Sequence, residues 1–83
     1  MNKLGYGLYE AELAKLEAQV VEAKATLQVY FNQPVGIGEH PDLLTEVDKY
    51  VDKLAAAEDK IESIKRNFPP PSDLHQHIGE FDA

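Results

Sequence analysis

Two long runs of apolar residues at alternating spacings of three and four restrict the fold of this chain more than any other feature. One run extends from Tyr6 to Tyr30 and the other from Leu43 to Phe68. This spacing matches one face of an α-helix, whereas a β-strand alternates with a period of two. The sequence therefore predicts two amphipathic helices, each with one apolar seam. The seam residues are Tyr6, Tyr9, Leu13, Leu16, Val20, Ala23, Leu27 and Tyr30 in the first helix and Leu43, Val47, Tyr50, Leu54, Ala57, Ile61, Ile64 and Phe68 in the second.

Helix formers and helix breakers set the expected bounds of the first helix. Residues 10–31 contain neither glycine nor proline and are rich in Ala, Leu, Glu, Lys and Gln. Gly5 and Gly7 are expected to fray the beginning of the helix, because glycine loses the most backbone entropy on ordering. We therefore place the first helix at about residues 8–31, with Asn32 ending it.

Prolines mark both ends of the second helix. Pro41 suits a first helical turn, where its missing N–H would have no partner. Pro69–Pro71 cannot continue a helix, so we place the second helix at residues 41–67. Two helices of similar length predict an all-α fold, an antiparallel two-helix hairpin that forms one domain over residues 1–68. The remaining residues, 69–83, are expected to form an extended, acidic tail that begins in polyproline II conformation.

The expected pairing of the helices brings together residues whose numbers sum to about 72. Tyr6 and Tyr9 would then meet Phe68 at the end of the hairpin opposite the loop. We expect these three rings to pack as an aromatic plug.

A second apolar row on the first helix needs a partner of its own. Its residues are small or β-branched and recur every three or four positions, so a second backbone can approach closely. A hairpin of this size buries too little apolar surface to be stable without staples, and the chain has no cysteine. We therefore expect a homo-oligomeric helical bundle, with a dimeric four-helix bundle as the simplest form. The alternative is that the alanines are only exposed, helix-forming surface. The row consists of Ala11, Ala14, Ala18, Val21, Ala25 and Val29.

Composition excludes several classes of function. Fifteen acidic and eight basic residues give a net charge of −7, the wrong sign for direct binding to nucleic-acid phosphates. The sequence contains no secretory h-region and no run of about 18 apolar residues, so we expect a cytoplasmic protein that does not enter a membrane. No hydroxyl is spaced with a histidine and a carboxylate, and thiol chemistry is absent, so we expect no enzymatic activity.

The connection between the helices is the first candidate site. It has nine residues, 32–40, whereas an αα-hairpin needs about two to five. Its glycines would turn backbone N–H groups toward an anion at the start of the second helix, and Tyr30 would stack on a base. No basic residue lies between Lys24 and Lys49, so positive charge must come from His40 or from the second helix of a neighbouring protomer. The alternative is a structural cap, with Tyr30 in the core. The candidate binding residues are Tyr30, Asn32, Gly36, Gly38, His40, Lys65 and Arg66.

The tail offers two histidines, His75 and His77, but four ordered ligands are hard to gather on it. We therefore predict no metal site and no cofactor. The triproline or Phe81 would instead dock on another protein if the tail has a partner.

The loop and one part of the second helix resemble a known group of proteins. Residues 32–44, Asn-Gln-Pro-Val-Gly-Ile-Gly-Glu-His-Pro-Asp-Leu-Leu, and residues 57–62, Ala-Glu-Asp-Lys-Ile-Glu, carry the resemblance. They are similar to small uncharacterised helical-hairpin proteins of large tailed bacteriophages, over about residues 8–68. The resemblance implies an infected bacterial cytoplasm, where small oligomeric phage proteins inhibit host enzymes or sequester nucleotide immune signals.

Three functions are compatible with these features. The first is a non-catalytic, self-associating protein that sequesters a host factor or a small nucleotide signal in pockets between protomers. The second is a structural or virion-associated adaptor whose tail docks on a larger body. The third is an acidic DNA mimic, although basic residues interleave the acidic ones on the second helix.

Overall fold

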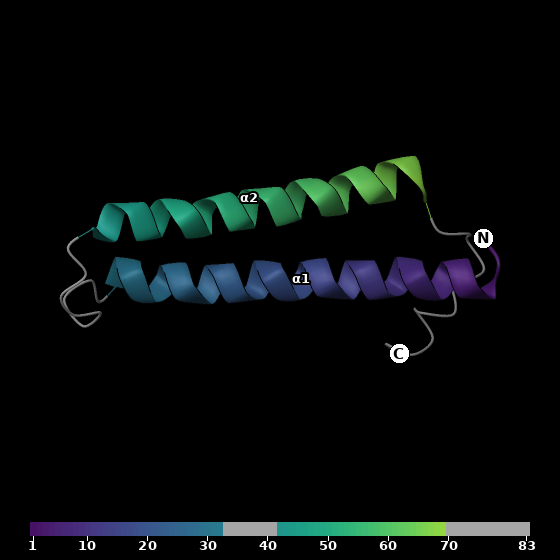
Figure 1. The fold of residues 1–83 in the computed structure, drawn as a ribbon, viewed down its shortest axis with the longest axis horizontal. Coiled ribbons are helices and arrows are strands. Elements are labelled where there is room, and N and C mark those ends of the chain that lie inside the picture. The colour runs from purple at the N-terminus through teal and green to yellow at the C-terminus, as the bar shows by residue number, and fades with distance from the viewer. Residues whose placement is uncertain (33–41, 70–83) are drawn as a thin grey trace.

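The computed structural model describes residues 1–32 and 42–69 of the chain. These residues form two helices, α1 (Lys3–Asn32) and α2 (Leu43–Asn67). The helices lie side by side and run in opposite directions (Figure 1). The prediction of an all-helical hairpin is therefore confirmed for the described part of the chain. The predictions for Gly36, Gly38, His40, Pro41 and the tail from residue 70 onward lie outside the described residues.

Helix α1 begins at Lys3, not at residue 8, so the predicted fraying at Gly5 and Gly7 is wrong. Asn2 caps the helix: its side-chain Oδ1 accepts a hydrogen bond from the Gly5 N–H at 2.8 Å. Its backbone carbonyl accepts one from the Tyr6 N–H, also at 2.8 Å. An asparagine cap contributes about 1 kcal/mol, which offsets much of the cost of about 0.5–1 kcal/mol for each of the two helical glycines.

Helix α2 begins two residues later than the predicted position 41, because Asp42 is its N-cap and not part of its first turn. The Asp42 carboxylate accepts a hydrogen bond from the Thr45 N–H at 3.1 Å. The predicted end at residue 67 is confirmed. There the Phe68 N–H donates to the Ile64 carbonyl at 2.9 Å, while Pro69 follows at once.

The two predicted seams form the interface between the helices. The buried side chains are Tyr9, Leu16, Ala23 and Leu27 on α1 and Ala57 on α2. The other seam residues are half-buried, with one exception. Phe68 is 62% exposed, so its predicted place in an aromatic plug with Tyr6 and Tyr9 is wrong.

The register of the hairpin differs from the predicted one by about one helical turn. Glu22 contacts Lys53, and Tyr30 contacts Glu46. Each partner on α2 lies three or four residues further along than the predicted pairing would place it. This shift places Phe68 level with about residue 8 of α1, so it does not account for the exposed ring. The C-terminal end of α2 instead leans away from α1 (Figure 1).

The second apolar row of α1 lies on the face turned away from α2. At 100° per residue, its mean direction is about 180° from that of the buried seam. All six predicted residues of the row are exposed, including Val21 at 67% and Val29 at 51%. Because the helix begins at Lys3, the row also gains Leu4 and Leu8, which are 75% and 65% exposed. Neither helix of the described residues is long and apolar enough to span a membrane.

Candidate functional site

Two tyrosines from different helices meet close to the loop end of the hairpin. Tyr30 lies in the last turns of α1, and Tyr50 lies in the first half of α2. Their ring centroids are 6.2 Å apart and the ring planes are tilted by 36°. Both residues are half-buried, so part of each ring remains accessible to a ligand. Both interpretations of Tyr30 are therefore compatible with the structure, since the ring packs against the seam and also reaches the surface.

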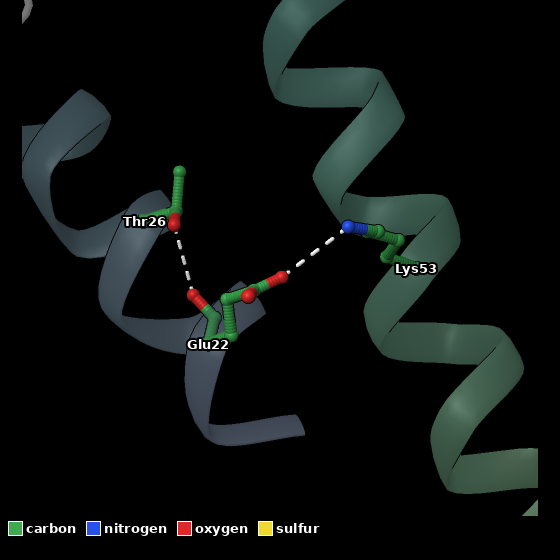
Figure 2. Close-up of polar contacts among 3 residues, drawn as sticks. All are labelled: Glu22, Thr26 and Lys53. Carbon is green, nitrogen blue, oxygen red and sulfur yellow. Dashed lines mark hydrogen bonds and ion pairs between the residues drawn. The ribbon is translucent and has the colours of Figure 1, made fainter. Parts of the chain in front are cut away.

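Two ammonium groups lie over the ring of Tyr50. The Nζ atoms of Lys49 and Lys53 are each 5.5 Å from its centroid, within the range of a cation–π interaction. Lys53 also forms an ion pair with Glu22 at 3.2 Å, the contact that ties α2 to α1 (Figure 2). None of the described residues places a carboxylate within ion-pair distance of Lys49. Its charge is therefore the one most available to an anionic ligand.

Thr26, one turn after Glu22, bonds to the backbone of Glu22 and not to its carboxylate. Thr26 Oγ1 donates to the backbone carbonyl of Glu22 at 2.9 Å, so the hydroxyl satisfies the helix and does not compete for the carboxylate (Figure 2). Both charged side chains of the Glu22–Lys53 pair are about half exposed, so the pair contributes at most about 1 kcal/mol. Its main effect is to fix the position of Lys53 beside Tyr50.

Tyr30 is held by an acidic neighbour. Burial raises the pKa of the Tyr30 phenol, and the charge of Glu46, the adjacent Tyr50 and a hydrogen bond to the Glu46 carboxylate add to this effect. The phenol therefore stays protonated at neutral pH and acts as a hydrogen-bond donor. This environment is unfavourable for a nucleophile or a general base, which need the opposite shift.

We call Tyr30, Glu46, Lys49, Tyr50 and Lys53 the tyrosine platform. Aromatic faces bind planar rings by stacking, at about 1–3 kcal/mol per base in nucleic-acid complexes. The adjacent ammonium groups attract phosphate, and the Glu46 carboxylate can accept a hydrogen bond from an amine. The chemistry of the platform thus fits a planar, anionic ligand of the nucleotide class.

The structure separates the other predicted binding residues. The Asn32 side-chain amide donates to the Gln28 carbonyl at 2.8 Å and so ends α1, as the structural interpretation predicted. Lys65 and Arg66 lie at the other end of the hairpin from Tyr30, and Arg66 pairs with Glu62 at 3.6 Å. Within one chain, therefore, neither of these two basic residues can reach the platform.

Sequence reasoning missed the basic half of the platform because it searched the loop and not the helix. Lys49 and Lys53 stand one residue before and three residues after Tyr50, and the i, i+3 spacing places Lys53 on the same helix face as the ring. The pairing with Tyr30 was hidden by the register, since a sum of about 72 puts Tyr30 opposite Asp42. With the observed register Tyr30 lies opposite Glu46, one turn before Tyr50.

A shallow hollow of about 310 Å³ lies between the helices nearer the opposite end of the hairpin. Leu16, Ile64 and Phe68 contribute apolar surface, and Glu12, Lys60 and Ser63 contribute polar groups. It lies where α2 leans away from α1 (Figure 1). Its charged groups are two carboxylates, Glu12 and Asp59, and one ammonium, Lys60, so it lacks the excess of positive charge that an anionic ligand needs.

No cluster of three or more metal-ligating side chains occurs among residues 1–32 and 42–69. No family model, no curated protein and no solved structure matches the chain.

Proposed function

We propose that this protein is a non-catalytic, homo-oligomeric binding protein that sequesters a small nucleotide signal. The resemblance to phage hairpin proteins gives this proposal its setting, an infected bacterial cytoplasm in which the protein would act against host defence. The other form of the same function is the capture of a host protein.

The tyrosine platform is the observation that supports the nucleotide form. A protein that only sequesters its ligand needs affinity and no reactive group, and stacking plus charge can supply affinity. The Tyr30–Tyr50 pair offers the stacking surface, and Lys49 offers a charge that no described carboxylate neutralises. The raised pKa of Tyr30 keeps the phenol as a donor and not as a reacting group.

The proposal is tested by thermal denaturation of the full chain against a panel of linear and cyclic mono-, di- and trinucleotides. A ligand at 100 times its Kd should stabilise the protein by about 2.7 kcal/mol. For a domain of this size, that raises the melting temperature by roughly 10 °C or more. Isothermal titration calorimetry then gives the Kd of any nucleotide that raises the melting temperature of the protein.

Lys49→Ala is the diagnostic variant, and Lys60→Ala is its control, since both remove an exposed lysine from α2. Lys49→Ala should weaken nucleotide binding by about 1 kcal/mol, or roughly fivefold, while Lys60→Ala should leave the Kd unchanged. A full panel without any thermal shift would reject the nucleotide form. If a pull-down from host lysate is also clean, sequestration is wrong in both forms.

A further inference from the structure

We propose that the outer face of α1 docks against the same face of a second copy, with the two α1 helices antiparallel and a two-fold axis near Ala18. This inference rests on the self-association in the proposed function and adds the docking face and its orientation. The outer face consists of Leu4, Leu8, Ala11, Ala14, Ala18, Val21, Ala25 and Val29, and every one of these residues is exposed in the single chain.

The hairpin needs a partner because it buries few apolar side chains between its own two helices. Its interface contains five buried side chains, two of them alanines, while four large aliphatic side chains of the outer face are at least half exposed. A domain of this size is marginal even with a full core. A contiguous apolar row along the whole length of a 30-residue helix is therefore a docking surface for another helix.

The distribution of side-chain size along the face favours an antiparallel partner. Alanine recurs every seven residues at Ala11, Ala18 and Ala25, and the larger residues other than Val21 lie toward the ends. In an antiparallel pair centred on Ala18, Ala11 lies opposite the partner's Ala25 and Leu8 lies near the partner's Val29. Large residues then meet medium ones at both ends, and the helix axes keep an even separation. A parallel pair would stack Leu4 and Leu8 on their own copies at one end and so force the helices apart there.

The charges beside the face favour the same orientation. Lys15 and Glu22 lie on one edge, and Glu10 and Lys24 lie on the other; all four are exposed. A two-fold axis near Ala18 brings each lysine opposite the partner's glutamate on the same edge, which gives four attractive pairs against one repulsive contact of Glu17 with its own copy. In a parallel pair the edges cross, so the two attractive contacts between Glu10 and the partner's Lys15 are cancelled by the two repulsive contacts between Glu17 and the partner's Glu22.

Self-association with α1 in the middle also fits the position of α2. The buried seam and the outer face lie on opposite sides of α1, so a second copy can dock without displacing α2 from the first. The ion pair between Glu22 and Lys53 leaves the second oxygen of the Glu22 carboxylate available for the partner's Lys15.

Cysteine cross-linking tests the orientation directly, because the chain has no cysteine of its own. Ala11→Cys and Ala25→Cys are prepared as separate full-length chains, mixed and oxidised. The antiparallel pair predicts a disulfide between the two different chains and none within either chain alone. In a parallel pair, position 11 of one chain lies about 21 Å from position 25 of the other, far beyond the roughly 4–7 Å that a disulfide spans between Cα atoms. Ala56→Cys on α2 is the matched control at an exposed alanine and should not cross-link.

Self-cross-linking of Ala11→Cys would overturn the proposal in favour of a parallel pair. A chain that stays monomeric in sedimentation equilibrium, with no cross-link in any mixture, would overturn the docking face itself. As a second measurement, Glu10→Lys and Lys24→Glu chains should prefer each other over themselves by roughly fivefold or more, because only the mixed pair has opposite charges on that edge. If the Glu10→Lys and Lys24→Glu chains pair with each other no more often than with themselves, the two-fold axis near Ala18 is wrong. None of these readouts uses a nucleotide, so they are independent of whether the platform binds one.

Discussion

Removal of the Tyr9 hydroxyl is expected to stabilise the hairpin. Tyr9 is 7% exposed, and its hydroxyl oxygen is buried without a hydrogen-bond partner among the described residues. An unsatisfied buried polar group costs about 1–3 kcal/mol relative to its solvated state in the unfolded chain. Tyr9→Phe keeps the ring and its packing against the seam and removes only this cost. We therefore expect the free energy of unfolding to rise by about 1 kcal/mol, which raises the melting temperature of a domain this small by about 4–8 °C.

Urea denaturation and thermal unfolding, both followed by circular dichroism at a fixed protein concentration, measure this change. The fixed concentration matters because self-association also raises apparent stability. Tyr50→Phe is the control, since Tyr50 is half-buried in the same interface on the side of α2 and its substitution should change the free energy of unfolding by less than about 0.5 kcal/mol. If Tyr9→Phe lowers stability by 1 kcal/mol or more, the hydroxyl has a partner that one chain does not provide, and the reasoning is refuted.

Three further predictions follow from single contacts. Ala57→Leu should lower the free energy of unfolding by about 1–3 kcal/mol because Ala57 is 1% exposed, whereas Ala56→Leu on the exposed side of the same helix should be neutral in urea denaturation. Asp42→Ala removes the cap of α2 and should cost about 1 kcal/mol by the same measurement, while Asp42→Asn, which keeps an acceptor oxygen, should cost less. Because the pKa of Tyr30 is raised in the folded chain, the unfolded chain loses the phenol proton at a lower pH. The free energy of unfolding should therefore fall as the pH rises above the ordinary pKa of tyrosine. In Glu46→Gln, ultraviolet titration should show the pKa of Tyr30 move back toward that ordinary value.

The helical pattern was predictable because it is redundant. Sixteen seam positions carry the same period, so a single misplaced residue such as Phe68 does not change the fold. The start of α1 was not predicted, because the cost of Gly5 and Gly7 was weighed without the cap that offsets it. Asn2 three residues before Gly5 is a standard start signal, and the helix begins where this cap places it. Helix ends depend on one or two hydrogen bonds, and for that reason they are harder to predict than helix faces.

The tyrosine platform was only half predictable, for a different reason. Tyr30 could be identified from its place beside the loop, but its neighbours depend on the pairing of two helices. An error of one turn in that pairing exchanges Asp42 for Glu46 and removes Tyr50 and Lys49 from consideration. Periodicity specifies which face of each helix is buried, and it leaves the shift along the axis to the packing of particular side chains, such as Tyr30 on Tyr50.

The opposite placement of the two apolar faces of α1 constrains how the proposed assembly and the proposed binding site relate. A bundle with one shared core needs each helix to present faces about 90° apart, whereas those of α1 are about 180° apart. The proposed pair is therefore a row of four helices with both α1 helices in the middle, and not the closed four-helix bundle that the sequence suggested. Tyr30 is twelve residues from Ala18, so the two platforms would lie about 36 Å apart at opposite ends of the row. Each platform is then built from one chain, and substitutions on the outer face and at the platform should act additively.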